Sequence, residues 1–126
     1  MNMIRKDEGK RWEQFIGAQG ESLARKYFSE KGYEILHTNW RHGHWEIDII
    51  AAESETLHII EVKTRNSRSG GYPEENVNRK KLLTLTKAAE VYMSMDKRWQ
   101  HLQFDILAIN LSGKGPEFFL LEDVYL

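Results

Sequence analysis

The sequence predicts an α/β fold in which a mixed sheet of four to five strands is flanked by helices. Two long segments carry apolar residues at helical spacing, and five shorter segments have the apolar runs that are typical of strands. These segments follow one another in the order αβββαββ. A chain of 126 residues with this order is expected to form one domain around one core, with a flexible N-terminus over residues 1–9.

The first helix is expected over residues 10–31, where apolar residues recur every three to four positions. Gly17 and Gly20 lower the helix propensity of this segment, which indicates close packing against another element. Gly32 is typical of the residue that ends a helix, because glycine adopts the left-handed conformation required there without a steric penalty.

The remaining elements are predicted from a change in the spacing of apolar residues and from the positions of turn residues. Short apolar runs predict strands, a segment with Ser, Gly and Pro predicts a loop, and a later return of helical spacing predicts the second helix. The expected elements are strands at residues 33–38, 46–52 and 57–64, a loop at 66–76, a helix at 77–95, strands at 102–111 and 117–121, and a turn at 112–116.

The composition excludes several classes of protein. Hydrophobic residues make up 40% and charged residues 29%, which is typical of a globular rather than a disordered chain. No apolar run approaches the roughly 20 residues that span a bilayer, and no secretory signal is visible, so we expect a cytoplasmic protein without a membrane partner. The absence of cysteine excludes disulfides, thiolate zinc sites and a cysteine nucleophile.

The two central strands predict a hairpin with a defined register. The segment between them is short, which favours antiparallel pairing, and a symmetric loop pairs residues whose numbers sum to 109. This register places Asp48 opposite Glu61 and Glu46 opposite Lys63, and strand alternation places Asp48 on the same face as Ile50.

These four polar side chains suggest a site for metal-assisted phosphodiester hydrolysis. Two facing carboxylates repel each other, and a divalent cation such as Mg²⁺ or Mn²⁺ relieves that repulsion. Lys63, two residues after Glu61, is placed to hold a scissile phosphate or to lower the pKa of an attacking water. A solvated polar sheet face, with a surface ion pair between Glu46 and Lys63 worth under about 1 kcal/mol, explains the same pattern and stays open.

Three further candidates stay open in the same way. Glu21 lies at the edge of the packed stripe of the first helix, where the helical pattern alone favours an exposed glutamate over a metal ligand. His42 and His44 alternate with the two acids of the following strand, which makes a zinc or manganese site conceivable, although the glycine between them favours a loop. Asp105 begins an apolar strand, where a structural hydrogen bond is expected.

A local basic patch can supply the contacts to nucleic acid that the net charge of −1 does not. A solvated helix start is the alternative interpretation. Trp40 and Trp45 can stack on bases, but core or turn packing is favoured for both. The basic residues of the patch are Lys63, Arg65, Arg68, Arg79, Lys80 and Lys81.

The order of several motifs resembles the YraN-like family of uncharacterised bacterial proteins. The motifs are GAQGESLARKYFSEKGYEIL, then N-W-R, EIDIIA, IIEVKTR, a G-x-P loop, a Lys-rich helix and FDILAI, and together they run from Gly17 to Ile109. That family is similar to the PD-(D/E)xK, or restriction-endonuclease-like, superfamily and to archaeal Holliday-junction resolvases. One position departs from the family pattern, because Trp45 stands where glycine usually precedes the E-I-D acid.

The resemblance implies a single endonuclease-like domain and assigns roles to individual residues. Asp48, Glu61 and Lys63 take the three signature positions, and Glu21 takes the helical acidic position, which reverses the preference drawn from the helix pattern. The main-chain carbonyl of Val62 is implied as a further metal ligand, and Lys80 or Lys81 as an auxiliary phosphate contact.

The function expected from the residues and the resemblance together is a Mg²⁺- or Mn²⁺-dependent DNA endonuclease acting on branched or flapped DNA. The alternative is a non-catalytic nucleic-acid-binding module that retains the nuclease fold, and a third hypothesis is an interaction protein without a nucleic-acid role. A homodimer is attractive for a four-way junction, which has symmetry of its own.

Overall fold

The computed structural model describes residues 6–66 and 78–125, and it confirms the predicted α/β architecture and the order αβββαββ. The N-terminal helix begins at Lys6, four residues earlier than expected, so residues 6–9 are helical. Most of the loop expected at residues 66–76 lies outside the described residues. The elements are α1 (Lys6–Glu30), β1 (Glu34–His42), β2 (Trp45–Glu53), β3 (Thr56–Arg65), α2 (Arg79–Met95), β4 (His101–Ser112) and β5 (Gly115–Leu121).

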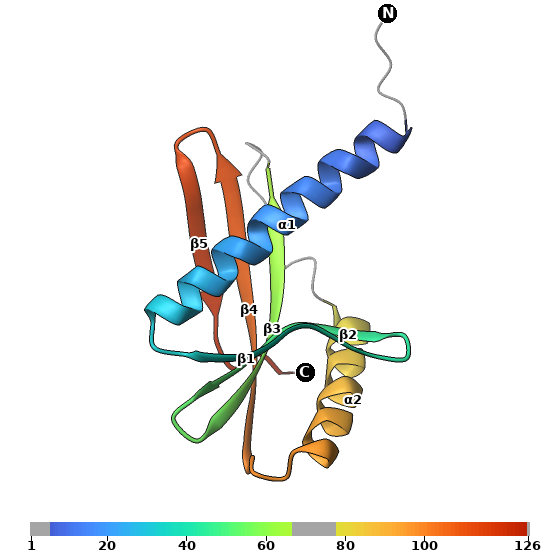
Figure 1. Cartoon of the computed structure of the whole chain (residues 1–126), viewed down its shortest axis with the longest axis vertical. Coiled ribbons are helices and arrows are strands. Elements are labelled where there is room, and N and C mark those ends of the chain that lie inside the picture. The colour runs from blue at the N-terminus through green and yellow to red at the C-terminus, as the bar shows by residue number, and fades with distance from the viewer. Residues whose placement is uncertain (1–5, 67–77, 126) are drawn as a thin grey trace, which may run out of the picture.

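The five strands form one mixed sheet in the order β1-β2-β3-β4-β5. Neighbouring strands are antiparallel except for β3 and β4, which are parallel and are therefore joined by a crossover that contains α2. The two helices lie on opposite faces of the sheet, with α1 running diagonally across one face (Figure 1). This is the arrangement that the resemblance to the restriction-endonuclease-like superfamily implied.

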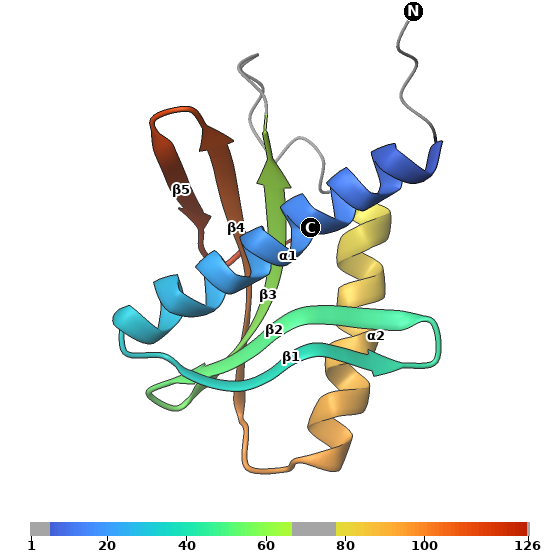
Figure 2. The same ribbon diagram turned by 45° about the horizontal axis from the view of Figure 1, so that its top comes forward.

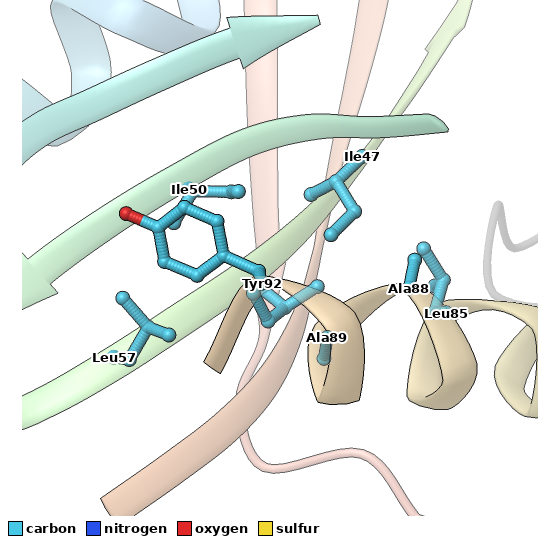
Figure 3. Close-up of a cluster of buried hydrophobic side chains, with 8 residues drawn as sticks. Ile47, Ile50, Leu57, Leu85, Ala88, Ala89 and Tyr92 are labelled. Atoms are coloured by element: carbon cyan, nitrogen blue, oxygen red, sulfur yellow. The ribbon is translucent and has the colours of Figure 1, made fainter. Parts of the chain in front are cut away.

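Each helix buries an apolar stripe against its own face of the sheet. On the face of α1, Ala24 and Phe28 are fully buried against isoleucines of β2 and β3. On the other face, α2 packs its alanines, Leu85 and Tyr92 against β2 and β3 (Figure 3). The members of this second cluster are Ile47, Ile50, Leu57, Ile59, Leu85, Ala88, Ala89 and Tyr92. Within the described ranges, neither helix has the length and apolarity needed to cross a membrane.

Two glycines mark where α1 ends and where it packs closely against the sheet. Gly32 ends the helix with a φ of +90°, and the N–H of Tyr33 donates to the carbonyl of Phe28, as predicted for a glycine-terminated helix. Gly20 is buried against Thr64, and a Cβ atom there would overlap the threonine hydroxyl. The close packing predicted for Gly17 is wrong for the part of the chain that the structure describes, where a Cβ atom at this position would meet no atom within 4 Å.

The β2–β3 hairpin has the predicted register. The paired residues run from Ile49 with Ile60 to Glu53 with Thr56, and each pair of numbers sums to 109. Pairing between the strands stops at Ile49, while β2 stays paired with β1 as far as Trp45. The β1–β2 hairpin swings away from β3 towards α2 (Figure 2), and the two central strands therefore separate where the predicted acids lie.

Candidate metal and phosphodiester site

The opening between β2 and β3, which we call the fork, is closed by a side chain instead of by strand pairing. The backbone N–H of Val62 donates a hydrogen bond to Oδ2 of Asp48 at 2.8 Å. The N–H and the carbonyl of one strand residue point towards the same neighbouring strand. The carbonyl of Val62 therefore also faces the fork, which is the orientation required for the predicted main-chain ligand.

The bend of β2 changes which side chains share a face. Ile47 and Ile50 both pack in the cluster on the α2 side, although they are three residues apart. Asp48 instead lines a pocket with residues of α1, so the prediction that Asp48 shares a face with Ile50 is wrong. The predicted Glu46–Lys63 pair is also wrong, because the bent strand brings Glu46 within 3.3 Å of Arg41 in β1.

Glu61 is buried, and its two carboxylate oxygens have different surroundings. Oε1 lies 3.5 Å from the ammonium group of Lys63 and 3.6 Å from that of Lys81. Oε2 is buried and has no hydrogen-bond partner among the described residues. A buried carboxylate oxygen without a partner carries a substantial desolvation cost, which a bound cation would remove.

The electrostatics of Asp48 reflect its closeness to Glu61. Burial and, after it, the negative charge of Glu61 raise the pKa of Asp48 to about 7, with a smaller raising contribution from Glu46. The hydrogen bond from Val62 and the positive charge of Lys81 lower the same pKa. Asp48 therefore titrates close to neutral pH, where a cation would compete with a proton for it.

Glu21 is held near the fork by a residue that sequence reasoning did not single out. The amide Nδ2 of Asn39 in β1 donates to Oε2 of Glu21 at 3.2 Å. Asn39 has a φ of +52°, a left-handed conformation that asparagine tolerates better than most residues. Asn39 belongs to the N-W-R motif of the family resemblance, which was the signal available in the sequence.

Asp48 and Glu21 line a pocket of about 420 Å³ on the α1 side of the fork. Its walls come from α1 and from the end of β3, and it is open to solvent on one side. The lining residues are Ile16, Gly17, Glu21, Asp48, Val62, Thr64 and Asn66.

These residues fit a hard divalent cation. Among the described residues, no group of three His, Asp or Glu side chains is clustered tightly enough to form an all-carboxylate or histidine cage. The fork offers two carboxylates, Asp48 and Glu61, and the carbonyl of Val62. Mg²⁺ is commonly held by one or two carboxylates and keeps several waters, so this smaller donor set suits it.

The other sequence candidates lie apart from this donor set. His42 stacks on Trp40 at 6.1 Å between ring centroids, and His44 is exposed. Trp40 and Trp45 both pack against the α2 cluster, as the packing interpretation predicted. Asp105 is buried and accepts hydrogen bonds from the side chain of Gln103 and the backbone of Asp123, which confirms its structural role.

The basic residues divide between the site and its surroundings. Lys81 contacts Glu61, whereas Lys80, its neighbour in the first turn of α2, is exposed. Arg65 ends β3 and is partly buried, and Arg79 is exposed at the start of α2. Arg68 lies outside the described residues. The structure thus distinguishes Lys81 from Lys80, which the sequence did not.

Comparison with known proteins identifies the family. The chain matches Uncharacterised protein family UPF0102 over residues 20–109. It is 43% identical over 97 residues to a UPF0102 protein of Chlorobaculum tepidum, covering 76% of this chain and 75% of the relative. A UPF0102 protein of Bacteroides thetaiotaomicron is 42% identical over 94 residues, covering 75% and 78%. One of Caldicellulosiruptor bescii is 45% identical over 116 residues, covering 87% and 96%. The YraN-like family predicted from the motifs is thereby confirmed, and the chain belongs to the uncharacterised protein family UPF0102.

Proposed function

We propose that this protein is a divalent-metal-dependent endonuclease that hydrolyses phosphodiester bonds in DNA, with branched or flapped DNA as its substrate. The observation that carries the proposal is Oε2 of Glu61, which is buried and has no hydrogen-bond partner among the described residues, near a second, partly buried carboxylate, Asp48. A structural ion pair needs no such oxygen, whereas a cation site does. The two lysines beside the acids provide the positive charge that a phosphodiester requires.

Asp48, Glu61 and the carbonyl of Val62 would hold Mg²⁺ or Mn²⁺ in the fork, and Glu21 would complete the acidic set through a water. When bound, the cation would supply charge stabilisation at the phosphodiester oxygens. Val62 fixes Asp48 through the 2.8 Å hydrogen bond, so that this carboxylate does not rotate freely. Lys63 remains 30% exposed, which leaves its ammonium group free to orient a water or to meet a phosphate.

Further positive charges lie in the first turn of α2 and at the end of β3. Lys81 is 38% exposed and adjoins the metal ligand Glu61, so it would hold the phosphate nearest the reaction. Lys80 and Arg65 would contact phosphates further along the strand, and Arg68 is retained as a contact from its position in the sequence. Binding through these charges would weaken steeply as salt concentration rises.

A cleavage assay on a panel of labelled DNAs tests the proposal. Single strand, duplex, flap and four-way junction would be incubated with purified protein in Mg²⁺ or Mn²⁺. We expect cleavage that EDTA abolishes and that Asp48→Ala and Lys63→Ala proteins lack. Absence of cleavage, together with calorimetry showing no cation binding that depends on Asp48, would contradict it. Salt-dependent DNA binding without cleavage would identify a binding module instead.

A further inference from the structure

We propose that the pocket beside the fork receives one unpaired nucleobase, so that the substrate is DNA with a base outside its stack. This inference rests on the proposed function and names the feature of DNA that the protein selects. It starts from the position of the pocket, which shares Asp48 with the metal site but opens on the opposite side of β3 from Lys63 and Lys81.

The charges on the two sides of β3 indicate where the phosphate and the base of a bound nucleotide would lie. Among the described residues that line the pocket, Glu21 and Asp48 are carboxylates and none is a cation, so apart from the cation proposed at Asp48 they offer no positive charge to a phosphate. Lys63 and Lys81 lie at Glu61 on the α2 side and would attract it. A nucleotide at the fork would therefore place its phosphate on the lysine side and direct its uncharged base into the pocket.

The pocket has the size and the chemistry that suit a base. Its volume of about 420 Å³ lies within the range of about 300–1,000 Å³ that is usual for small-molecule sites. Ile16 and Val62 supply apolar surface for the faces of a ring. Thr64 and Asn66 supply hydrogen-bonding groups for its edge. Proteins that take a base out of the stack hold it between apolar surfaces and recognise its edge in this way.

Gly17 keeps the pocket open. It lies one turn before Gly20, where α1 touches β3, yet a Cβ atom at Gly17 would meet no atom of a described residue within 4 Å. Glycine in a helix interior is less favourable than alanine or leucine by up to about 1 kcal/mol. Close packing explains this cost at Gly20. At Gly17 we explain the cost of a helical glycine by the pocket, because a larger side chain at this position would fill part of it.

Gly17→Leu tests the inference without removing any metal or phosphate contact. The substitution is expected to preserve folding, since it has free space and raises helix propensity. Ala18→Leu is the matched control, because it adds the same side chain on the exposed side of α1. Binding would be measured by fluorescence anisotropy in Ca²⁺, with a flap DNA and a set of flaps in which each unpaired nucleotide in turn is abasic.

We expect the substitution at Gly17 and the removal of one base to lower DNA affinity through the same interaction, so that their effects do not add. The Gly17→Leu protein should bind the intact flap about ten-fold more weakly than wild type, in line with the contribution of one bound base. The flap that lacks the recognised base should bind the wild-type protein about as weakly as the intact flap binds the Gly17→Leu protein. The Gly17→Leu protein should bind this abasic flap no more weakly than it binds the intact flap. The Ala18→Leu protein should match wild type on every probe.

The outcomes separate this inference from the proposed function. Equal losses for Gly17→Leu on intact and abasic flaps, or no loss at all, would overturn the base pocket while leaving the nuclease intact. Non-additive losses of DNA affinity, together with no cleavage of any DNA, would support the base pocket and contradict the proposed nuclease activity. Failure of the wild-type protein to bind any DNA would overturn both.

Discussion

The ammonium group of Lys81 lies 3.6 Å from Oε1 of Glu61, and it reaches this oxygen from the first turn of α2. Lys63 approaches the same oxygen at 3.5 Å from two residues along β3. Both lysines thus neutralise Oε1 of Glu61, whereas the other oxygen, Oε2, is buried without a hydrogen-bond partner among the described residues. The preceding residue, Lys80, is also a lysine but is exposed, so it serves as a control for the contact between Lys81 and Glu61.

Replacing Lys81 should affect cation binding and DNA binding in opposite directions. In the Lys81→Met protein the acids lose a neighbouring positive charge, so Mn²⁺ should bind several-fold more tightly by calorimetry. The same protein should cleave DNA at least about ten-fold more slowly, because a phosphate contact is lost. Lys80→Met, which removes a phosphate contact further from the acids, should change Mn²⁺ affinity by less than about two-fold and should slow cleavage less than Lys81→Met does. Weaker cation binding in the Lys81→Met protein would show that Lys81 supports Glu61 structurally instead.

Cation affinity should rise with pH through neutrality. Asp48 must lose its proton to bind a cation, and its pKa lies near 7 instead of its ordinary 3.8. Below this pH each bound cation should release about one proton from Asp48, and well above it none. Calorimetry in buffers of different ionisation enthalpy measures this release. An affinity that stays constant between about pH 5.5 and pH 8 would contradict a shifted Asp48.

Asp48 should destabilise the metal-free fold above neutral pH. A carboxyl group whose pKa is raised on folding holds its proton more tightly in the folded state, so stability falls as pH rises from about 3.8 to about 7. Asp48→Asn should therefore raise the free energy of unfolding at pH 8 by about 2–4 kcal/mol in EDTA, and by little near pH 4. Urea unfolding at both pH values measures the difference. Glu46→Gln, on the same strand but paired with Arg41, should change stability at pH 8 by less than about 1 kcal/mol.

The two glycines of α1 should respond oppositely to the same substitution. A Cβ atom at Gly20 would overlap the hydroxyl of Thr64 and lie 2.9 Å from its Cβ, so Gly20→Ala should destabilise the fold by about 1–3 kcal/mol. Gly17→Ala meets open space and should stabilise it by about 0.5–1 kcal/mol. Denaturant unfolding of both variants checks the pair. Equal effects would mean that α1 does not approach β3 as described.

Asp105 should be a major source of stability away from the site. Its carboxylate lies 2.6 Å from Nδ1 of buried His58 and accepts from Gln103 at 2.9 Å and from the N–H of Asp123 at 3.0 Å. Asp105→Asn should reduce the free energy of unfolding by about 2–4 kcal/mol, because an amide cannot accept at both positions. Glu30→Gln, which removes an exposed pair with Lys26, should leave the unfolding midpoint nearly unchanged. A similar loss in both variants would show that burial of Asp105 does not matter.

The order of elements and the register of the β2–β3 hairpin could be predicted because both follow from local spacing. Apolar periodicity marks the helices and strands, and a short loop fixes which residues lie opposite each other. The bend of β2 could not be predicted in this way. It depends on packing between the β1–β2 hairpin and α2, which brings Tyr92 to 5.5 Å from Trp40 between ring centroids.

The same limit applies to the positions predicted for the polar residues of the two central strands. The register predicted Asp48 opposite Glu61, but pairing between β2 and β3 ends at Ile49 with Ile60, so this pair does not form. Asp48 still lies close enough to Glu61 for that negative charge to raise its pKa. Glu46 was misassigned because the alternation argument assumed that the two strands stay paired. The choice between Lys80 and Lys81 needed the helical phase of α2, which begins at Arg79 with Asn78 as its N-cap instead of at residue 77.

The crossover between β3 and β4 makes one part of the candidate site depend on long-range pairing during folding. The three antiparallel pairs join strands that follow one another directly along the chain, so these hairpins can form early. The parallel β3–β4 pair joins Thr56 to His101 across a long segment, and pairing over such a separation is slow. Lys81 is carried on α2 inside this segment, so it reaches Glu61 only when the crossover closes. A partly folded chain with its acidic hairpin already formed would lack this lysine at the site, which makes the complete site a late product of folding.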